Sequence, residues 1–278
     1  MFHQTFSSMN TRFSMVLPAI DAQDGMQLAL EVRSLLAGQE SLMSRFGAHG
    51  ALASLNRSAA HRAAPVPPAL WEVLQTCWRH HRLSEGAFDI AQGGRPGSRG
   101  MGLLDIDPAA RTVRFDAPGV QLDLGGIGKG IALDLVRQRL RERGVEQALL
   151  SFGESSLAVI GTHPGADCWP LGVEDLFHPG KSLHRFTLRD GAMSTSGNRA
   201  GQAHIINPGE DQPISGCRTV SVTCASAADA EALSTALFVL APAQRADVLR
   251  HYADVQAVEF VYLEHSGHWT VEKRWQHD

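Results

Sequence analysis

Residues 122–136 read LDLGGIGKGIALDLV, a short apolar strand, a glycine-rich turn and an amphipathic helix in succession. Leu122 and Leu124 alternate with a polar residue, as strand residues do. Four glycines then fall within six positions, at 125, 126, 128 and 130. The helix that follows carries Ile131, Leu135 and Leu140 on one side. This order predicts a strand, a tight turn and a helix at the centre of the fold.

The glycine-rich turn suits a phosphate group. Glycine tolerates positive φ and lets another group approach the backbone closely. The first turn of a helix presents unpaired N–H groups and the positive end of the helix dipole, and Lys129 stands beside them. Asp123 and Asp134 place carboxylates before and after the turn. We therefore expect a nucleotide-type ligand and a cation here, although the spacing is neither G-x-G-x-x-G nor a Walker sequence, and close packing alone explains the glycines equally well.

Composition restricts the class of protein. The chain has 278 residues, 44% of them hydrophobic and 19% charged, which is enough for a large buried core. A net charge of −4 and 6% aromatic residues indicate neither a basic surface nor a stacking platform for nucleic acid. The four cysteines form no C-x-x-C pair, which argues against a disulfide framework or a structural zinc site and fits a reducing compartment.

The N-terminal segment does not predict a targeting sequence. Residues 1–17 contain no basic stretch followed by a long apolar core. No apolar run in the chain reaches the roughly 18 residues that a membrane helix needs. We therefore expect no secretory signal, no membrane segment and a cytoplasmic location.

Hydrophobic periodicity predicts an α+β fold with a mainly antiparallel sheet. Helices are expected at 24–46, from Pro68 to about Gly86, at the central turn, and at 227–240 and 243–252. Strands are expected at 6–17, 103–107, 112–115, 120–124, 147–152, 156–161, 169–174, 183–188, 193–196, 204–206 and 217–223, with a closing hairpin at 258–273. Without repeats or a low-complexity linker, residues 1–278 are expected to form a single domain.

Glu231 and Thr235 lie four residues apart in the helix predicted at 227–240, so that a carboxylate and a hydroxyl share one face. With nearby backbone carbonyls they could provide a hard oxygen site for Mg²⁺. The alternative is that Glu231 is an ordinary exposed first-turn residue that interacts with the helix dipole.

Two polar loops are further candidates. In AMSTSGNRAGQAHIINP, residues 192–208, His204 stands at the edge of a short strand beside a Ser/Thr/Gly loop. A histidine there could act as a general base, or it could be a hydrogen-bonded structural residue. Phe88 and Asp89 follow the helix that ends near Gly86 and could face a ligand, or this segment could simply cap the helix.

Eight short sequence segments, taken in their order along the chain, identify a family. The chain contains SMNTRF, LASLN, EGAFDIAQGG, LDLGGIGKGIALD, LLSFGE, STSG, HIINP and EALSTALFVL. From about residue 8 to about residue 265, this succession resembles the FAD:protein FMN transferases of the ApbE-like family. The resemblance implies a T-fold-like domain that binds FAD and Mg²⁺, transfers FMN to a Thr or Ser hydroxyl of a target flavoprotein, and releases AMP.

The resemblance also implies roles for individual residues. Asp123 and Lys129 would contact FAD, and His204 would activate the acceptor hydroxyl. The segments that line the flavin would contain Met9, Phe88, Asp89 and Ile206. The ligands of the metal would be the carbonyl of Gly126 and the side chains of Glu231 and Thr235.

The chain departs from the family pattern at several of these segments. Asn10 replaces a usual Gly, Ile90–Ala91 replaces Pro–Thr, Glu231 replaces Asp, and Asn207 replaces Asp. Because Lys129, His204 and a carboxylate at 231 are retained, an active FMN transferase is nevertheless the leading hypothesis. Two alternatives stay open: an FAD pyrophosphatase that releases FMN and AMP, and an FAD-binding protein without transfer activity.

Overall fold

The fold is built on an antiparallel sheet of eight strands in the order β1-β2-β6-β7-β10-β13-β14-β15. The computed structural model describes residues 1–47, 49–199, 201 and 203–278. The N-terminal and C-terminal hairpins form the two edges of this sheet. The strands are β1 (Phe2–Ser8), β2 (Thr11–Leu17), β6 (Ala148–Phe152), β7 (Ser156–Ile160), β10 (Ala192–Asn198), β13 (Cys217–Cys224), β14 (Gln256–His265) and β15 (His268–His277).

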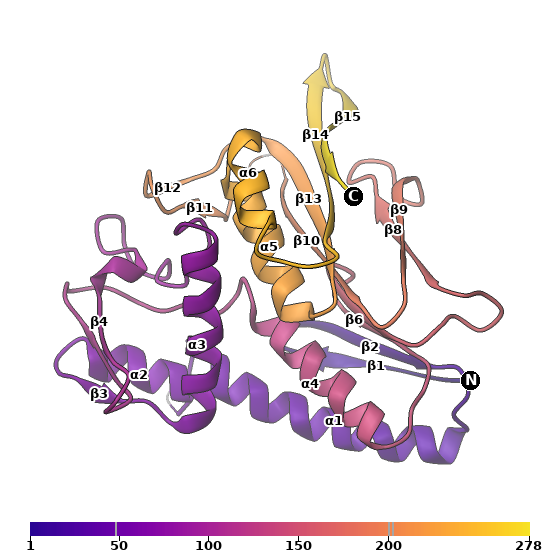
Figure 1. Ribbon diagram of the computed structural model, residues 1–278, viewed down its shortest axis with the longest axis horizontal. Coiled ribbons are helices and arrows are strands. Elements are labelled where there is room, and N and C mark those ends of the chain that lie inside the picture. The colour runs from indigo at the N-terminus through magenta and orange to yellow at the C-terminus, as the bar shows by residue number, and fades with distance from the viewer. Residues whose placement is uncertain (48, 200, 202) are drawn as a thin grey trace.

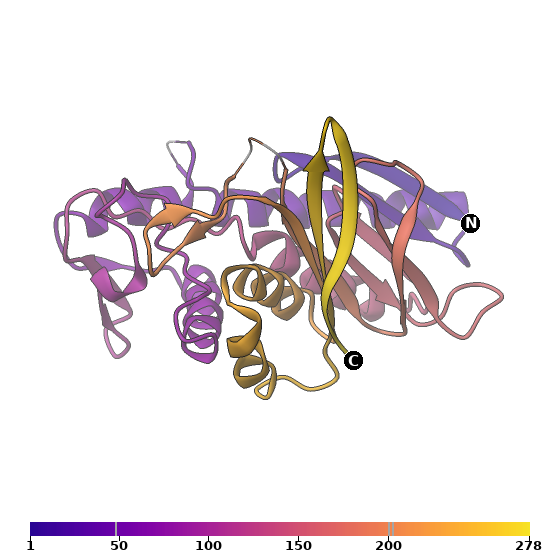
Figure 2. The ribbon, with the colours of Figure 1, turned by 90° about the horizontal axis from the view of Figure 1, so that it is seen from above.

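Three helices pack on one face of the sheet: α1 (Ala22–Met43), α4 (Gly128–Glu142) and α5 (Ala227–Val239) (Figure 1). Beneath α1 and α4 the core includes the fully buried side chains of Phe13 and Phe152. The opposite face packs against the hairpin of β8 (Trp169–Glu174) and β9 (Ser182–Leu188), through a separate apolar cluster that contains Trp169 and Phe260 (Figure 2). The central strands are therefore covered on both faces, whereas the edge strands β1 and β15 keep exposed residues.

A second group of elements lies beside the main sheet, on the left in Figure 1. It contains α2 (Ala51–Ala59), α3 (Pro68–Leu83) and a small sheet of β3 (Ala64–Pro65), β5 (Thr112–Phe115) and β4 (Leu104–Asp107). Its apolar core is continuous with the side of α5 that includes Leu237 and Phe238. The remaining elements are η1 (Met101–Leu103), β11 (Ile206–Asn207), β12 (Gln212–Pro213) and α6 (Pro242–Leu249).

The predicted α+β class and the mainly antiparallel sheet are confirmed, and most elements lie within a few residues of their expected positions. The strand expected at 6–17 is wrong, because β1 and β2 form a hairpin there. Its turn residues Met9 and Asn10 have φ of 50° and 59°, values that tight two-residue hairpins require. The alternation of apolar residues in fact breaks between Phe6 and Phe13, where residues 7–12 read SSMNTR, and the single predicted strand overlooked this break.

The strand expected at 120–124 is also wrong, although the segment immediately precedes the central turn. Its backbone groups bond to irregular partners instead of a neighbouring strand. The Leu122 N–H donates to Asn56 Oδ1 (2.8 Å), Asn56 Nδ2 donates to the Leu122 carbonyl (3.0 Å), and the Asp123 N–H donates to the Ile90 carbonyl (2.7 Å). The side chain of Asn56 therefore satisfies backbone groups that a strand would have paired.

One smaller expectation, at His204, differs from the structure. The strand expected from His204 begins at Ile206, so His204 lies in the preceding loop. In the described part of the chain, no helix is both long enough and apolar enough to cross a membrane.

Gly130 is where α4 contacts the beginning of α5. A Cβ atom at Gly130 would lie 2.4 Å from the Ala227 carbonyl oxygen, which belongs to the backbone and has little room to move. We predict that Gly130→Ala lowers the free energy of unfolding by about 1–3 kcal/mol, as overpacking in a core does. Urea denaturation measures this change.

Gly38→Ala is the matched control, because Gly38 lies in α1 with no atom within 4 Å of an added Cβ. This substitution should raise stability by up to about 1 kcal/mol through helix propensity. If Gly130→Ala unfolds at or above the wild-type urea concentration, the close contact between α4 and α5 is contradicted.

Candidate active site

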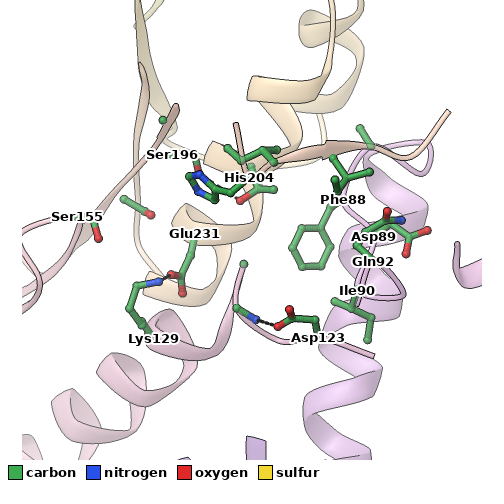
Figure 3. A pocket seen from close by; sticks show the side chains of 18 of the residues that line it. Phe88, Asp89, Ile90, Gln92, Asp123, Lys129, Ser155, Ser196, His204 and Glu231 are labelled. Atoms are coloured by element: carbon green, nitrogen blue, oxygen red, sulfur yellow. Dashed lines mark hydrogen bonds and ion pairs between the residues drawn. The ribbon is translucent and has the colours of Figure 1, made fainter. Parts of the chain in front are cut away.

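A cavity of about 490 Å³ lies between the beginning of α4, the middle of α5, the end of β10 and the loop after α3 (Figure 3). Residues from six separated segments border it, so only the tertiary fold brings them together. Nine of the ten residues singled out in the sequence line this cavity: Phe88, Asp89, Asp123, Gly126, Lys129, His204, Ile206, Glu231 and Thr235.

Glu231 is buried at the centre of the polar contacts, with 3% of its surface exposed. One carboxylate oxygen, Oε1, forms an ion pair with Lys129 and accepts a hydrogen bond from Ser156 Oγ (3.3 Å). The other, Oε2, accepts from the backbone N–H of Gly130 in the first turn of α4 (2.5 Å). The alternative of an exposed first-turn residue is therefore wrong.

The hydroxyl groups along β10 and α5 form a connected chain. Ser196 Oγ is hydrogen-bonded to Ser234 Oγ (2.8 Å) and to Thr235 Oγ1 (3.2 Å). Thr235 also faces the glycine-rich turn, since a Cβ atom at Gly126 would lie 3.6 Å from Thr235 Oγ1. The predicted trio of Gly126, Glu231 and Thr235 therefore lies along one wall of the cavity.

These three residues offer donors that suit Mg²⁺, namely a carboxylate, a hydroxyl and a backbone carbonyl. Among the residues that the structure describes, no group of three or more His, Cys, Asp or Glu side chains could hold a metal ion. Magnesium is commonly held by one or two carboxylates together with phosphate oxygens of the substrate. The donor chemistry therefore fits a magnesium site that a bound phosphate would complete.

Asp123 positions the glycine-rich turn. Its Oδ1 accepts from the Gly125 N–H (2.9 Å), and its Oδ2 lies 3.1 Å from Arg45 Nε. The carboxylate thus holds the turn by a local hydrogen bond and by an ion pair to the segment after α1. It also borders the cavity, where a ligand could contact it.

The segment around Phe88 and Asp89 is fixed by hydrogen bonds to groups outside the cavity. Asp89 borders the cavity, but its side chain is only 3% exposed, and its carboxylate accepts from the backbone N–H groups of Ala91 (2.7 Å) and Met101 (2.8 Å). A ring nitrogen of His81 is hydrogen-bonded to the Phe88 carbonyl (2.9 Å). The Asp89 carboxylate therefore fixes the loop, while the Phe88 ring faces the cavity (Figure 3).

His204 lies in the loop between β10 and β11, exposed at the border of the cavity. The fully buried side chain of Asn198, at the end of β10, holds this loop. Asn198 Nδ2 donates to the Ile214 carbonyl (2.7 Å), and Asn198 Oδ1 accepts from the His204 N–H (3.4 Å). One buried amide thus connects the loop that carries the histidine to the residue that follows β12.

Met9 is the one predicted residue that does not border the cavity. It lies in the turn between β1 and β2, where its N–H donates to Glu40 Oε2 (3.1 Å). Its side chain packs against the beginning of α4, since a Cβ atom at Gly128 would lie 3.4 Å from Met9 Cε. In this structure Met9 therefore supports the helix that carries Lys129.

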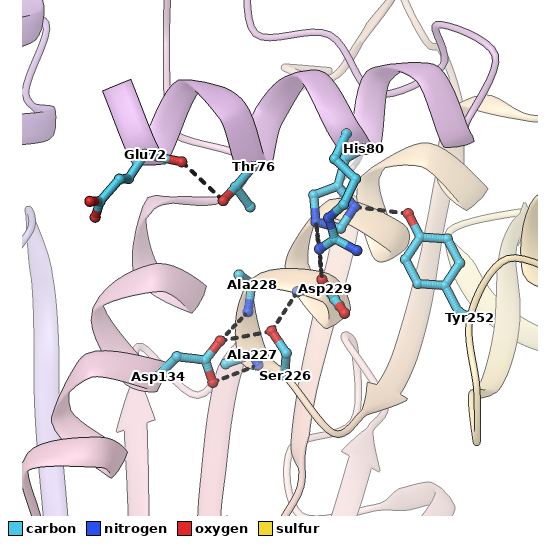
Figure 4. Close-up of polar contacts among 10 residues, drawn as sticks. Glu72, Thr76, His80, Asp134, Ser226, Ala227, Ala228, Asp229 and Tyr252 are labelled. Atoms are coloured by element: carbon cyan, nitrogen blue, oxygen red, sulfur yellow. Dashed lines mark hydrogen bonds and ion pairs between the residues drawn. The ribbon is translucent and has the colours of Figure 1, made fainter. Parts of the chain in front are cut away.

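Asp134 lies outside the cavity and caps α5 instead (Figure 4). Its carboxylate accepts from Ser226 Oγ (2.8 Å) and from the N–H groups of Ala227 (2.9 Å) and Ala228 (3.0 Å). Although Asp134 follows the glycine-rich turn closely in sequence, it does not border the cavity. Because it fixes the beginning of α5, Asp134 places Glu231 one turn further along the helix.

A charged cluster joins α3 to α5 through His80 and Asp229 (Figure 4). The buried His80 ring lies edge-on to Phe88, and its Nε2 is 3.1 Å from Asp229 Oδ1. Burial by itself would raise the pKa of Asp229, but hydrogen bonds from His80 and Arg79 bring it below its usual value. Asp229 therefore stays ionised, and the cluster supports the cavity wall from outside.

Sequence reasoning missed several residues that border or support the cavity. Ser156, Ser196 and Asn198 lie in segments that were recognised only as strands or as a polar loop. Gln92 borders the cavity as well, and although it lies in the motif EGAFDIAQGG, no role was expected for it. Single polar residues of this kind carry no spacing pattern, so only their tertiary contacts reveal them.

Known proteins resemble this chain over most of its length. The model of the ApbE family matches residues 9–95 and 97–259. A protein named FAD:protein FMN transferase from Rhodobacter capsulatus is 34% identical over 225 residues, covering 69% of this chain and 42% of that protein. A protein of the same name from Klebsiella pneumoniae is 25% identical over 263 residues, covering 83% of this chain and 81% of that protein. The chain thus spans less than half the length of the Rhodobacter capsulatus relative.

Solved structures show the same fold. The flavin transferase ApbE from Vibrio cholerae superposes with a TM-score of 0.80 at 22% identity, covering 98% of this chain and 96% of the other. The ApbE protein from Thermotoga maritima superposes with a TM-score of 0.81 at 20% identity, with the same coverage. With the family match extending over nearly the whole sequence, this chain belongs to the ApbE family.

Proposed function

We propose that this protein is a flavin transferase that moves FMN from FAD to a Ser or Thr hydroxyl of an acceptor flavoprotein and releases AMP. The main support for the proposal is the composition of one cavity. It contains Lys129 at a helix N-terminus, His204 at its border and a set of hard oxygen donors. Membership of the ApbE family, together with the names of the relatives, supports this reaction.

Lys129 and the N–H of Gly130 would bind the pyrophosphate of FAD. In the present structure both donate to the carboxylate of Glu231, an anion of the protein itself. A phosphate oxygen suits the same donors, because it carries negative charge and lies favourably at a helix N-terminus. Binding of FAD would therefore replace the Lys129–Glu231 ion pair with a Lys129–phosphate pair and leave the carboxylate free to turn.

The freed carboxylate would lie on the same helix face as Thr235, beside the carbonyl of Gly126. These three groups would hold Mg²⁺, which when bound neutralises negative charge on a phosphoryl group. Phosphoryl transfer depends mostly on such electrostatic stabilisation and on positioning. The residue at 231 therefore links the anion-binding and the metal-binding parts of the cavity.

His204 would take the proton of the acceptor hydroxyl as that oxygen attacks the phosphorus of the FMN half. The bond from this phosphorus to the bridging oxygen breaks, and AMP leaves with that oxygen. Because His204 is exposed at the border of the cavity, an acceptor side chain can reach it from outside. The hydrogen bond from the backbone N–H of His204 to Asn198 Oδ1 would hold the loop while the imidazole takes the proton.

The exposure of His204 also favours a second candidate function. Water can reach the same histidine, and water in place of the acceptor hydroxyl would give FMN and AMP, the products of an FAD pyrophosphatase. A protein that binds FAD without cleaving it is the third hypothesis, motivated by Ala91 and Asn207, which lack the hydroxyl and the carboxylate usual in the family.

One incubation separates the three hypotheses. The protein is mixed with FAD, Mg²⁺ and an acceptor protein that carries a Ser/Thr flavinylation sequence, and AMP release and acceptor mass are followed together. We expect AMP together with an acceptor heavier by one FMN. AMP with an unchanged acceptor mass would support the hydrolase, and bound FAD without AMP would contradict both enzymatic functions.

His204→Ala should lower the transfer rate by about 10²–10⁴-fold, the usual contribution of a general base, while the Kd for FAD stays within about twofold. Acceptor mass against time and titration calorimetry with FAD provide the two values. His265→Ala, at an exposed position in β14, is the control and should behave as wild type. A large loss of FAD binding in His204→Ala would disprove the role as a base.

Glu231→Gln keeps the shape of the side chain but removes its charge. The Mg²⁺ concentration that gives half-maximal transfer should rise at least about tenfold, because a neutral amide is a weaker ligand for a hard cation. Glu142→Gln changes an exposed carboxylate of α4 and should leave the magnesium titration unchanged. If both variants titrate as wild type, Glu231 is not a metal ligand.

A further inference from the structure

A second hollow, here called the hairpin groove, lies between the loop that carries His204 and the end of the β14–β15 hairpin. Its volume is about 590 Å³, and its lining includes Ala203, Ser215, Leu263 and Trp269. The hairpin extends beyond the rest of the sheet (Figure 1). The groove shares no residue with the candidate active site, yet Ala203 borders the groove and the next residue, His204, borders the cavity. The two hollows are therefore neighbours along one loop.

Hydrogen bonds fix the loop side of the groove relative to His204. Asn198 Nδ2 donates to the Ile214 carbonyl (2.7 Å), and the Ile214 N–H donates to the Ile205 carbonyl (2.9 Å). Ile205 directly follows His204, and Ile214 directly precedes Ser215 in the groove lining. The groove thus keeps a set position beside the histidine without any ligand.

The hairpin side offers an apolar surface and an open strand edge. Leu263 and Trp269 are half-buried, and the Trp269 ring stacks on Phe177 with their centroids 4.2 Å apart. β13 pairs with β14 only as far as Tyr262, whereas β15 pairs with β14 to its end. Among the described residues, 263–265 therefore have a neighbouring strand on one side only. Such an edge can add an extended peptide through main-chain hydrogen bonds.

We propose that the hairpin groove binds an extended segment of the acceptor flavoprotein, next to the Ser or Thr that receives FMN. This inference rests on the proposed function, in which an acceptor hydroxyl reaches His204 from outside. The groove begins one residue from His204, and an extended chain advances by about 3.3 Å per residue. A side chain within a few residues of the modified hydroxyl can therefore enter the groove while the hydroxyl meets the histidine.

The lining indicates which side chain the groove accepts. Most of its surface is apolar, and the two charged residues at its border, Arg199 and Glu264, have opposite signs. The groove has no excess charge that would favour a nucleic acid or an anionic lipid surface. Apolar lining beside an open strand edge suits a peptide with an aliphatic or aromatic residue near the modified one.

Transfer rates at varied acceptor concentration test the proposal, with an acceptor protein that carries a Ser/Thr flavinylation sequence. Leu263→Glu places a carboxylate in the groove, and Ser215→Trp fills it from an exposed position that folding does not depend on. Each should raise the KM for the acceptor at least about tenfold, the loss expected for one buried apolar side chain. The kcat and the Kd for FAD should stay within about twofold. Leu104→Glu is the control, because this half-buried leucine of β4 borders neither hollow.

A change in the acceptor provides the matching half of the experiment. The apolar residues that flank its modified hydroxyl are replaced by Asp, which should raise the KM of the wild-type enzyme at least about tenfold. In Ser215→Trp the same replacement should add less than about twofold, because the two changes remove one shared contact. Independent effects that multiply would contradict a contact between the groove and this segment.

The remaining outcomes separate this proposal from the proposed function. If wild type transfers FMN and both groove variants keep the wild-type KM, the groove is not the acceptor site and the proposed function stands. If wild type transfers no FMN, both are contradicted. A fall in kcat without a rise in KM would mean that the substitutions disturb His204, which overturns the docking role. Light scattering that shows a wild-type dimer, dissociated by Ser215→Trp at unchanged KM, would assign the groove to a second copy of this chain instead.

Discussion

The contact between the Glu231 carboxylate and the beginning of α4 is the interaction on which the cavity depends. It joins two helices that are about a hundred residues apart in sequence, through Lys129 and the backbone of Gly130. The contact is possible because glycine at 130 lets α5 approach the backbone of α4. A buried carboxylate needs such partners, since an unpaired charge in a protein interior is strongly unfavourable. The same donors are the ones that a phosphate would use.

The surrounding structure keeps these two helices in place. Asp134 of α4 caps the N-terminus of α5, so the helices are joined at a second point outside the cavity. Asp229, on α5, contacts His80 of α3, whose ring supports Phe88. The α4 side and the Phe88 side of the cavity are therefore both connected to α5. This explains why an almost completely buried helix carries both of the proposed side-chain metal ligands.

The sequence predicted the fold class and most of the cavity because glycine clusters, helical spacing and family motifs are local patterns. It did not predict what the individual carboxylates contact. Asp134, close to the glycine-rich turn in sequence, caps a helix, and the Asp89 carboxylate accepts from backbone N–H groups of its own loop at the border of the cavity. Ser156 and Ser196 were missed as well, because partners of single polar side chains depend on segments distant in sequence.

The most direct test of this account is a crystal structure of the protein with FAD bound. It should place a pyrophosphate oxygen within hydrogen-bond distance of Lys129 Nζ and the Gly130 N–H, with the Glu231 carboxylate turned away from both. A complex in which FAD occupies another part of the surface, or in which the Lys129–Glu231 pair persists with the pyrophosphate elsewhere, would contradict it.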